Sequence, residues 1–146
     1  MIKNLSAIVL LLVVVLASAC NTNPSKQEDY SDFANFYSRF HTDSLFQMAH
    51  ILFPLDGLPQ EADSLTIASG QFKWHKEDWV MHRGFDLEGN GFVQEFSPIG
   101  DDFIVEKIIH KEYALTITRH FSKIGDEWHL IYYSGLNRVA MSGNEQ

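Results

Sequence analysis

Apolar residues recur at helical spacing after residue 30. In the stretch YSDFANFYSRF they fall three and four positions apart, which predicts an amphipathic helix with Ser31 as its cap. The same spacing returns over residues 45–52 and predicts a second helix, and the break at residues 41–44 holds side chains able to cap it. The stretch FPLDGLP then ends the helical region, because proline lacks a backbone donor and disfavours helical geometry in the residue before it.

Beyond residue 60 the apolar period shifts toward two, which predicts strands. Short strands are expected at residues 64–67, 72–74 and 92–96, with residues 79–82 either a strand or a turn of helix. The clearest strands are FIVEKIIHK, ALTITRHFSKI and EWHLIYYSGL, joined by the links Glu112-Tyr113 and Gly125-Asp126. Helices followed by such strands indicate the α+β class, with N-terminal helices packed on one face of a strongly bent antiparallel sheet.

The only cysteine, Cys20, follows an apolar run. Lys3, the apolar residues 8–16 and the small residues 17–19 are typical of a secretion signal, and the run is shorter than the about 20 residues that span a bilayer. Two cleavage interpretations stay open. The small-x-small pattern ASA suits the ordinary signal peptidase, whereas LASAC resembles the lipobox of bacterial lipoproteins, although Leu16 lies four positions before the cysteine and three is usual.

We favour lipidation of Cys20, because the polar, proline-containing residues 21–29 would link an acylated residue to a folded body. Acyl chains, palmitate among them, would anchor the protein in the cell envelope. The absence of Asp at position 21 favours the outer membrane of a Gram-negative bacterium, on its periplasmic or its surface face. The expected organisation is a signal peptide (1–19), a lipidated tether (20–29), a single domain (30–137) and a flexible tail (138–146).

Charge and motifs limit the kinds of partner, metal and cofactor that we expect this chain to bind. The 146 residues carry a formal net charge of −8, which argues against nucleic-acid binding and against docking to anionic lipid by charge. One cysteine cannot form an internal disulfide or a cysteine-based zinc site. The loop DLEGNG resembles half of a calcium loop, but Ser97 stands where a bidentate Glu is needed. The seven histidines lack metal-ligand spacing, and no phosphate loop or GxSxG elbow occurs, so we expect no metal and no cofactor.

The patterns FxxFYSRFHTDSLFQMAHILFPL, KW…W and VEKIIHKEYALTITRHFSKIGDEWHLIYY resemble a group of small bacterial lipoproteins known only as a domain of unknown function. Members of that group are similar to the nuclear transport factor two fold, a cone of helices wrapped by a bent sheet that encloses a pocket. The resemblance covers residues 32–135. It implies a cone-like domain, but it carries no catalytic motif, and therefore no functional residue is transferred from it.

Strand alternation predicts which side chains face such a pocket. On its more apolar face, the first of the last three strands carries Glu106 and His110, the second carries Arg119 and the third carries Tyr132. Pairing of the first two strands through the link Glu112-Tyr113 places Glu106 opposite Arg119. Opposite charges on an apolar face would orient a polar group of a ligand, with His110 and Tyr132 beside them. The alternative is a rim ion pair worth about 0.2 to 1 kcal/mol that binds nothing. A register slip of one residue would invert these faces.

Three classes of function stay open. The first is a non-catalytic envelope lipoprotein whose pocket binds a small molecule or an envelope component. The second is a protein-interaction or structural module. The third is a cone-fold isomerase or hydratase, because Glu106, His110 and Tyr132 could supply acid–base groups, although their spacing does not require it. The resemblance adds the expectation of a homodimer formed through the outer face of the sheet.

Overall fold

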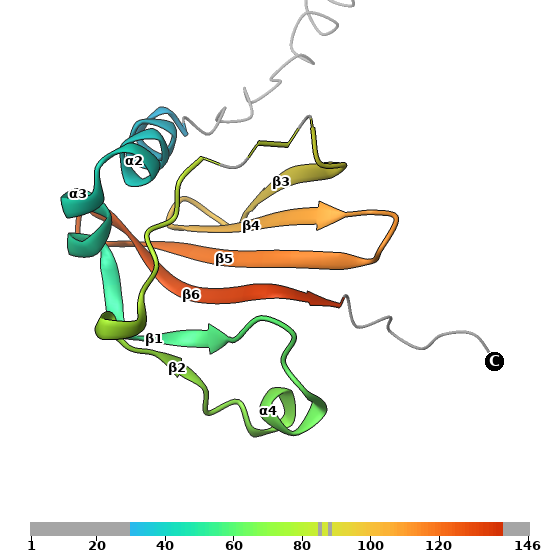
Figure 1. The fold of residues 1–146 in the computed structure, drawn as a ribbon. Coiled ribbons are helices and arrows are strands. Elements are labelled where there is room, and N and C mark those ends of the chain that lie inside the picture. Colours follow the sequence, from blue (N-terminus) through green and yellow to red (C-terminus); the bar gives the residue numbers. More distant parts are fainter. Residues whose placement is uncertain (1–29, 85, 88, 139–146) are drawn as a thin grey trace, which may run out of the picture.

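The computed structural model describes residues 30–84, 86–87 and 89–138. Its body is one six-stranded sheet in the order β2-β1-β6-β5-β4-β3 (Figure 1). The strands are β1 (Ile51–Leu58), β2 (Lys73–Trp74), β3 (Phe92–Pro98), β4 (Phe103–His110), β5 (Leu115–Ile124) and β6 (Glu127–Arg138). The expected signal peptide, Cys20 and the tether lie outside the described residues.

The α+β class is confirmed, but the sheet is mixed. Strands β3 to β6 form an antiparallel meander, whereas β1 runs parallel to β6, and the sheet is bent without closing into a barrel. The expectation of a wholly antiparallel sheet is wrong. Residues 53–58 of the stretch FPLDGLP, which the sequence predicts as the end of a helix, belong to β1 and pair in parallel with β6. The second helix ends at Ala49, and Leu52 lies in the strand.

Two helices cover one face of this sheet. Helix α2 (Ser31–Thr42) follows Tyr30, which provides no side-chain cap, so the expected cap at Ser31 is wrong. Helix α3 (Ser44–Ala49) is capped by Asp43, whose carboxylate accepts from the amide of Phe46 at 3.0 Å. The predicted break between the two helices is therefore confirmed, together with its capping chemistry.

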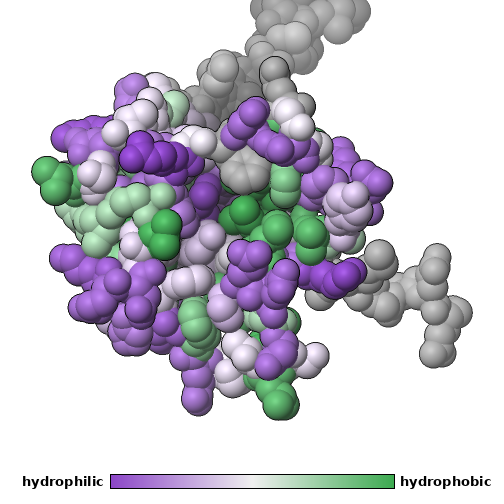
Figure 2. Space-filling model, in the orientation of Figure 1, coloured by the Kyte–Doolittle hydropathy of each residue, from purple (hydrophilic) through white to green (hydrophobic). Residues whose placement is uncertain are grey.

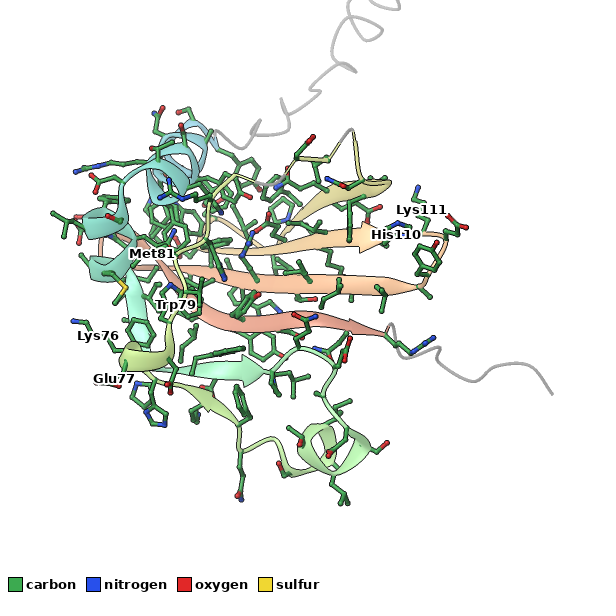
Figure 3. The ribbon with its side chains drawn as sticks, viewed as in Figure 1. Lys76, Glu77, Trp79, Met81, His110 and Lys111 are labelled. Atoms are coloured by element: carbon green, nitrogen blue, oxygen red, sulfur yellow. The ribbon has the colours of Figure 1, made fainter. Side chains whose placement is uncertain are left out.

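The segment between β1 and β3 departs most from its predicted strands. Residues 64–67 belong to helix α4 (Ser64–Ser69), because the Asp63 carboxylate accepts from the Thr66 amide at 2.7 Å and starts a helix. Residues 79–82 follow the 3₁₀ turn η1 (Lys76–Asp78) and form neither a strand nor a helix. The segment crosses the helix-covered face of the sheet, where Trp79 and Met81 are labelled in Figure 3.

An aromatic core joins the helices to the sheet. Phe33, Phe36 and Phe40 of α2 are each at least 92% buried and pack against Phe121 of β5 at ring-centroid distances of 5.4 to 5.8 Å. Burying a phenylalanine contributes about 1.5 to 3 kcal/mol relative to leaving it exposed. The apolar spacing of the first helix therefore supplies an aromatic surface that packs it on the sheet.

A buried glutamine fixes the segment that crosses this face. The Gln47 side chain of α3 is 1% exposed, and its amide donates to the carbonyls of Phe40 and His82 at 2.6 and 2.7 Å. Its oxygen accepts from the His82 amide at 2.8 Å and from the Trp79 indole at 3.2 Å. All four hydrogen-bonding positions of the amide are used, so Gln47 holds the crossing segment against α3.

One edge strand of the sheet is very short, and the other ends in a proline. At one edge β2 has two residues. At the other edge β3 ends at Pro98, which has no backbone N–H, and carries the exposed Glu95 in its middle.

Gly57 occupies a position without room for a side chain. A Cβ atom there would lie 1.9 Å from the Tyr133 carbonyl oxygen, which accepts from the Trp74 indole at 2.9 Å. The parallel pairing of β1 with β6 therefore depends on the close approach that glycine permits.

We expect Gly57→Ala to lower the free energy of unfolding by about 2 kcal/mol or more, because the two strands must separate. Urea unfolding followed by tryptophan fluorescence measures the effect. Gly84→Ala is the matched control, since a Cβ atom there meets no atom within 4 Å. Equal stability of the two variants would contradict this account of the strand pairing.

Candidate functional site

The predicted pairing of Glu106 with Arg119 is confirmed. The two residues are direct cross-strand partners on β4 and β5, and the Arg119 Nη1 donates to the Glu106 Oε2 at 3.0 Å. Glu106 is 0% exposed and Arg119 is 4% exposed, so the pair is in the core and the rim alternative is wrong. An unpaired carboxylate at this depth would cost several kcal/mol, which makes the arginine obligatory.

Two further side chains complete the surroundings of the carboxylate. The Tyr37 hydroxyl of α2 donates to the Glu106 Oε1 at 2.5 Å. The Gln94 amide of β3 donates to the same oxygen at 2.6 Å and to the Tyr37 oxygen at 2.7 Å. The side chains of Tyr37, Gln94, Glu106 and Arg119, here called the polar cluster, thus join a helix to three neighbouring strands.

The polar cluster keeps its protons in a fixed arrangement. Burial, followed by the negative charge of Glu106, raises the pKa of the Tyr37 hydroxyl above its ordinary value. The phenol therefore remains protonated at neutral pH and donates to the carboxylate. Both carboxylate oxygens are already accepting hydrogen bonds, so the cluster is suited to hold Tyr37 in place and poorly suited to exchange protons with a substrate.

One buried histidine, His41, and one half-buried histidine, His82, lie near the polar cluster. The His41 Nδ1 lies 2.9 Å from the Tyr37 carbonyl, which can only accept, so this nitrogen carries the proton. The His41 Nε2, the His82 Nδ1 and the Arg119 Nε are buried and have no hydrogen-bond partner among the described residues. Burial, reinforced by the positive charge of Arg119, lowers the pKa of His82 to about 2. Burial also lowers the pKa of His41, so both imidazoles are neutral at pH 7.

His110 and Tyr132 do not join the polar cluster. His110 shares the predicted face, but it is the last residue of β4 and packs against Phe92 and Tyr113, at the end of the strand remote from α2 (Figure 3). The predicted face of Tyr132 is wrong. A register shift between His120 and Phe121 pairs Tyr132 with His120 on the outer face, where the rings stack at 4.5 Å, and Tyr133 faces Arg119 instead.

An apolar groove, which shares Tyr37 with the polar cluster, lies between α2 and the edge strand β3. Its volume is about 330 Å³. We call it the α2–β3 groove, and it is lined by Tyr30, Phe33, Ala34, Tyr37, Ser38, Phe96, Pro98 and Ile104. The Tyr37 ring meets the Phe96 ring edge-on at a centroid distance of 5.2 Å, and Phe96 remains 43% exposed. Tyr37 therefore belongs both to the groove wall and to the polar cluster, whereas Glu106 and Arg119 lie behind it.

Sequence reasoning missed Tyr37 and Gln94 as members of the site. Gln94 lies between Phe92 and Phe96 on one face of β3, so the rule that singled out Glu106, a polar residue on an apolar face, would also have found it. Tyr37 lies on the apolar face of α2, and its sequence pattern gives no sign that its hydroxyl reaches β4. Ligand binding by Glu106, His110, Arg119 and Tyr132 stays a prediction.

Neither a cluster of metal ligands nor a membrane-spanning helix occurs among the described residues. In that part of the chain no three His, Cys, Asp or Glu side chains cluster closely enough to hold a metal ion. No helix of the described ranges is long and apolar enough to cross a membrane.

No family model and no curated protein matches the sequence. Among solved structures, the chain is similar to a nuclear transport factor two-like protein from Bacteroides fragilis, with 14% identity, a TM-score of 0.41 and coverage of 71% of this chain and 46% of that one. The chain is also similar to a nuclear transport factor two-like protein of unknown function from Pseudomonas putida. The identity is 10%, the TM-score is 0.38, and the match covers 77% of this chain and 88% of that one. For a protein of unknown function with a cystatin-like fold from Nostoc punctiforme, the identity is 11% and the TM-score is 0.33. That match covers 75% of this chain and 90% of the other one.

We expect Glu106→Ala to lower the free energy of unfolding by about 3 to 5 kcal/mol, because it leaves the Arg119 guanidinium buried without its partner. The double variant Glu106→Leu with Arg119→Met should recover most of this loss. Urea unfolding measures both. Asp56→Ala is the control, because it breaks the exposed ion pair with Lys73 and should cost less than about 1 kcal/mol. A loss of that small size for Glu106→Ala would contradict the importance of the buried pair.

The neutral histidines predict a loss of stability in mild acid. Their folded-state pKa values lie below the unfolded value of 6.5, so below pH 6.5 the unfolded chain binds protons that the folded one does not. Each histidine then lowers the free energy of unfolding by up to about 1.4 kcal/mol per pH unit. Urea midpoints should fall from pH 7 to pH 5, and His82→Gln should make this slope shallower, while His41 and the partly buried His120, whose pKa burial also lowers, account for the rest. An unchanged slope in that variant would contradict the assignment.

Proposed function

We propose that this protein is a non-catalytic envelope lipoprotein, anchored through acylated Cys20, whose α2–β3 groove binds a small molecule with an apolar body. The observation that carries the proposal is the groove itself. Its volume of about 330 Å³ falls within the range of about 300 to 1,000 Å³ that is usual for small-molecule sites, and seven of its eight lining residues are aromatic, aliphatic or proline. The remaining lining residue, Ser38, is small.

The polar cluster supports this function from behind the groove. An aromatic wall binds a ligand well only when its rotamers are fixed before binding. The Tyr37 ring is fixed by the hydrogen bonds of its hydroxyl with Glu106 and Gln94, and it meets Phe96 edge-on. The cross-strand pair predicted to contact a ligand directly is thus better suited to position the wall that does.

The place of the groove in the chain fits a membrane anchor. Tyr30, the first described residue, lines the groove. It lies ten positions after Cys20, and ten chain steps span at most about 33 to 36 Å. A protein acylated at Cys20 would therefore hold the groove close to the membrane surface, where apolar molecules concentrate.

A second proposal concerns the outer face of the sheet, where a homodimer was expected. A groove of about 350 Å³ lies there, and it is lined by residues that include Ile67, Ile109 and Tyr132. Beside it α4 buries none of its residues, and Leu65 is 82% exposed. We propose that a second copy covers this face, which would give the mass of a dimer in light scattering. Leu65→Lys with Ile67→Lys would then give a monomer.

Figure 2 shows that apolar surface also gathers near the middle of the helix-bearing face, over β4 and β5. A protein partner is therefore the alternative occupant of that face. One substitution that fills the groove distinguishes protein binding from small-molecule binding. Filling the α2–β3 groove abolishes small-molecule binding but leaves the surface over β4 and β5 unchanged.

We expect the soluble chain from residue 20 with Cys20→Ser to enhance the fluorescence of N-phenyl-1-naphthylamine in a saturable manner. Ala34→Trp should abolish the enhancement, because the indole would occupy the groove. Asn35→Trp is the matched control, since residue 35 is exposed on the same helix and does not line the groove. Equal binding by both variants would place the probe elsewhere and contradict the proposed site.

A further inference from the structure

We infer that the occupant of the α2–β3 groove is an acyl chain carried by Cys20 of the same molecule. The inference rests on the proposed function and names the ligand of that site. Its chemical class is a saturated hydrocarbon chain with an ester or amide carbonyl at one end, which is what acylation places on an N-terminal cysteine.

The lining fits the hydrocarbon part of that ligand. Phe33, Phe96 and Ile104 supply apolar surface without hydrogen-bonding groups, and the hydroxyl of Tyr37 is already bonded to Glu106. A charged or hydroxylated ligand would lose hydrogen bonds to water here and regain few. A methylene chain loses none, so it is the ligand class that this surface favours.

One unsatisfied atom fits the polar end. Tyr30 lines the groove, and its buried hydroxyl has no hydrogen-bond partner among the described residues. A buried hydroxyl without a partner costs about 1 to 3 kcal/mol, which an acceptor on the ligand would remove. The carbonyl at the head of an acyl chain accepts hydrogen bonds and cannot donate them, and the phenol can supply the proton.

Chain connectivity selects the source of the acyl chain. The groove begins at Tyr30, ten residues after Cys20, and the intervening residues are polar and include Pro24. A ligand tethered over so few residues is present at an effective concentration in the millimolar range, which a free lipid does not reach in the surrounding water. The acyl chain on Cys20 therefore has an advantage over lipids dissolved in water.

Thiol protection at the groove tests this assignment. Ser38 is an exposed residue that lines the groove, and Cys20 is the only native cysteine, so Ser38→Cys places a unique thiol there once Cys20 is acylated. The mature acylated protein in nanodiscs is compared with the unacylated Cys20→Ser chain, with mass spectrometry confirming the acyl groups. Asn35→Cys reports the general effect of the nearby bilayer.

We expect the Ser38→Cys thiol to react with a maleimide at least about tenfold more slowly in the acylated protein, with the Asn35→Cys thiol unchanged. Methyl laurate should protect the same thiol in the unacylated chain, and Tyr30→Phe should weaken that protection while leaving protection by dodecane unaltered. Protection by methyl laurate in the unacylated chain, with equally fast reaction in the acylated one, would overturn the inference and leave the proposed function standing.

Two other outcomes also count against the inference. Absence of protection by methyl laurate in the unacylated chain would overturn the groove as an acyl site and the proposed function with it. The unacylated chain can also be held on nanodiscs through a His-tag and nickel lipid. Equal protection in that arrangement would identify a bilayer lipid as the occupant and overturn the assignment to Cys20.

Discussion

A carboxylate with no exposed surface lies at the centre of this molecule, and the neighbouring elements are arranged to satisfy it. Glu106 cannot be buried as a charge without a cation, and Arg119 is the side chain directly across the sheet from it. Its second oxygen takes donors from Tyr37 and Gln94, which ties α2 and the edge strand β3 to the two central strands. Hydrophobic packing alone would let α2 slide along the aromatic core, because such packing is non-directional, whereas these hydrogen bonds define one position for it.

That position has a consequence for the groove. The Tyr37 ring belongs to the groove wall, and its hydroxyl belongs to the polar cluster, so the position of this apolar wall is set by polar contacts that lie behind it. The groove wall and the polar cluster behind it form two layers with different roles. The outer layer supplies apolar contact, and the inner layer supplies rigidity.

The sequence predicts the meander of β4, β5 and β6 well, because clear alternation and short turns leave few registers. It places Glu106 opposite Arg119 for this reason. The same reasoning fails at Tyr132, because a register shift beside His120 inserts one extra residue into β6. The pattern of apolar and polar residues does not predict this shift. In the middle of the chain, Asp63 starts a helix where alternation predicted a strand. The stretch FPLDGLP becomes a strand because Leu55 and Gly57 meet β6 and the core, a tertiary effect that local proline rules do not contain.

The edges of the sheet gain a particular meaning for a protein held on a surface. Anchored molecules diffuse in two dimensions and meet one another side by side far more often than they would in bulk solution, which favours strand-to-strand polymerisation. One edge of this sheet offers two residues for such pairing, and the other carries Glu95 and ends at Pro98. Both edges are therefore poor templates for a neighbouring copy, so a chain anchored as we propose could be crowded on a membrane without joining its neighbours into fibres.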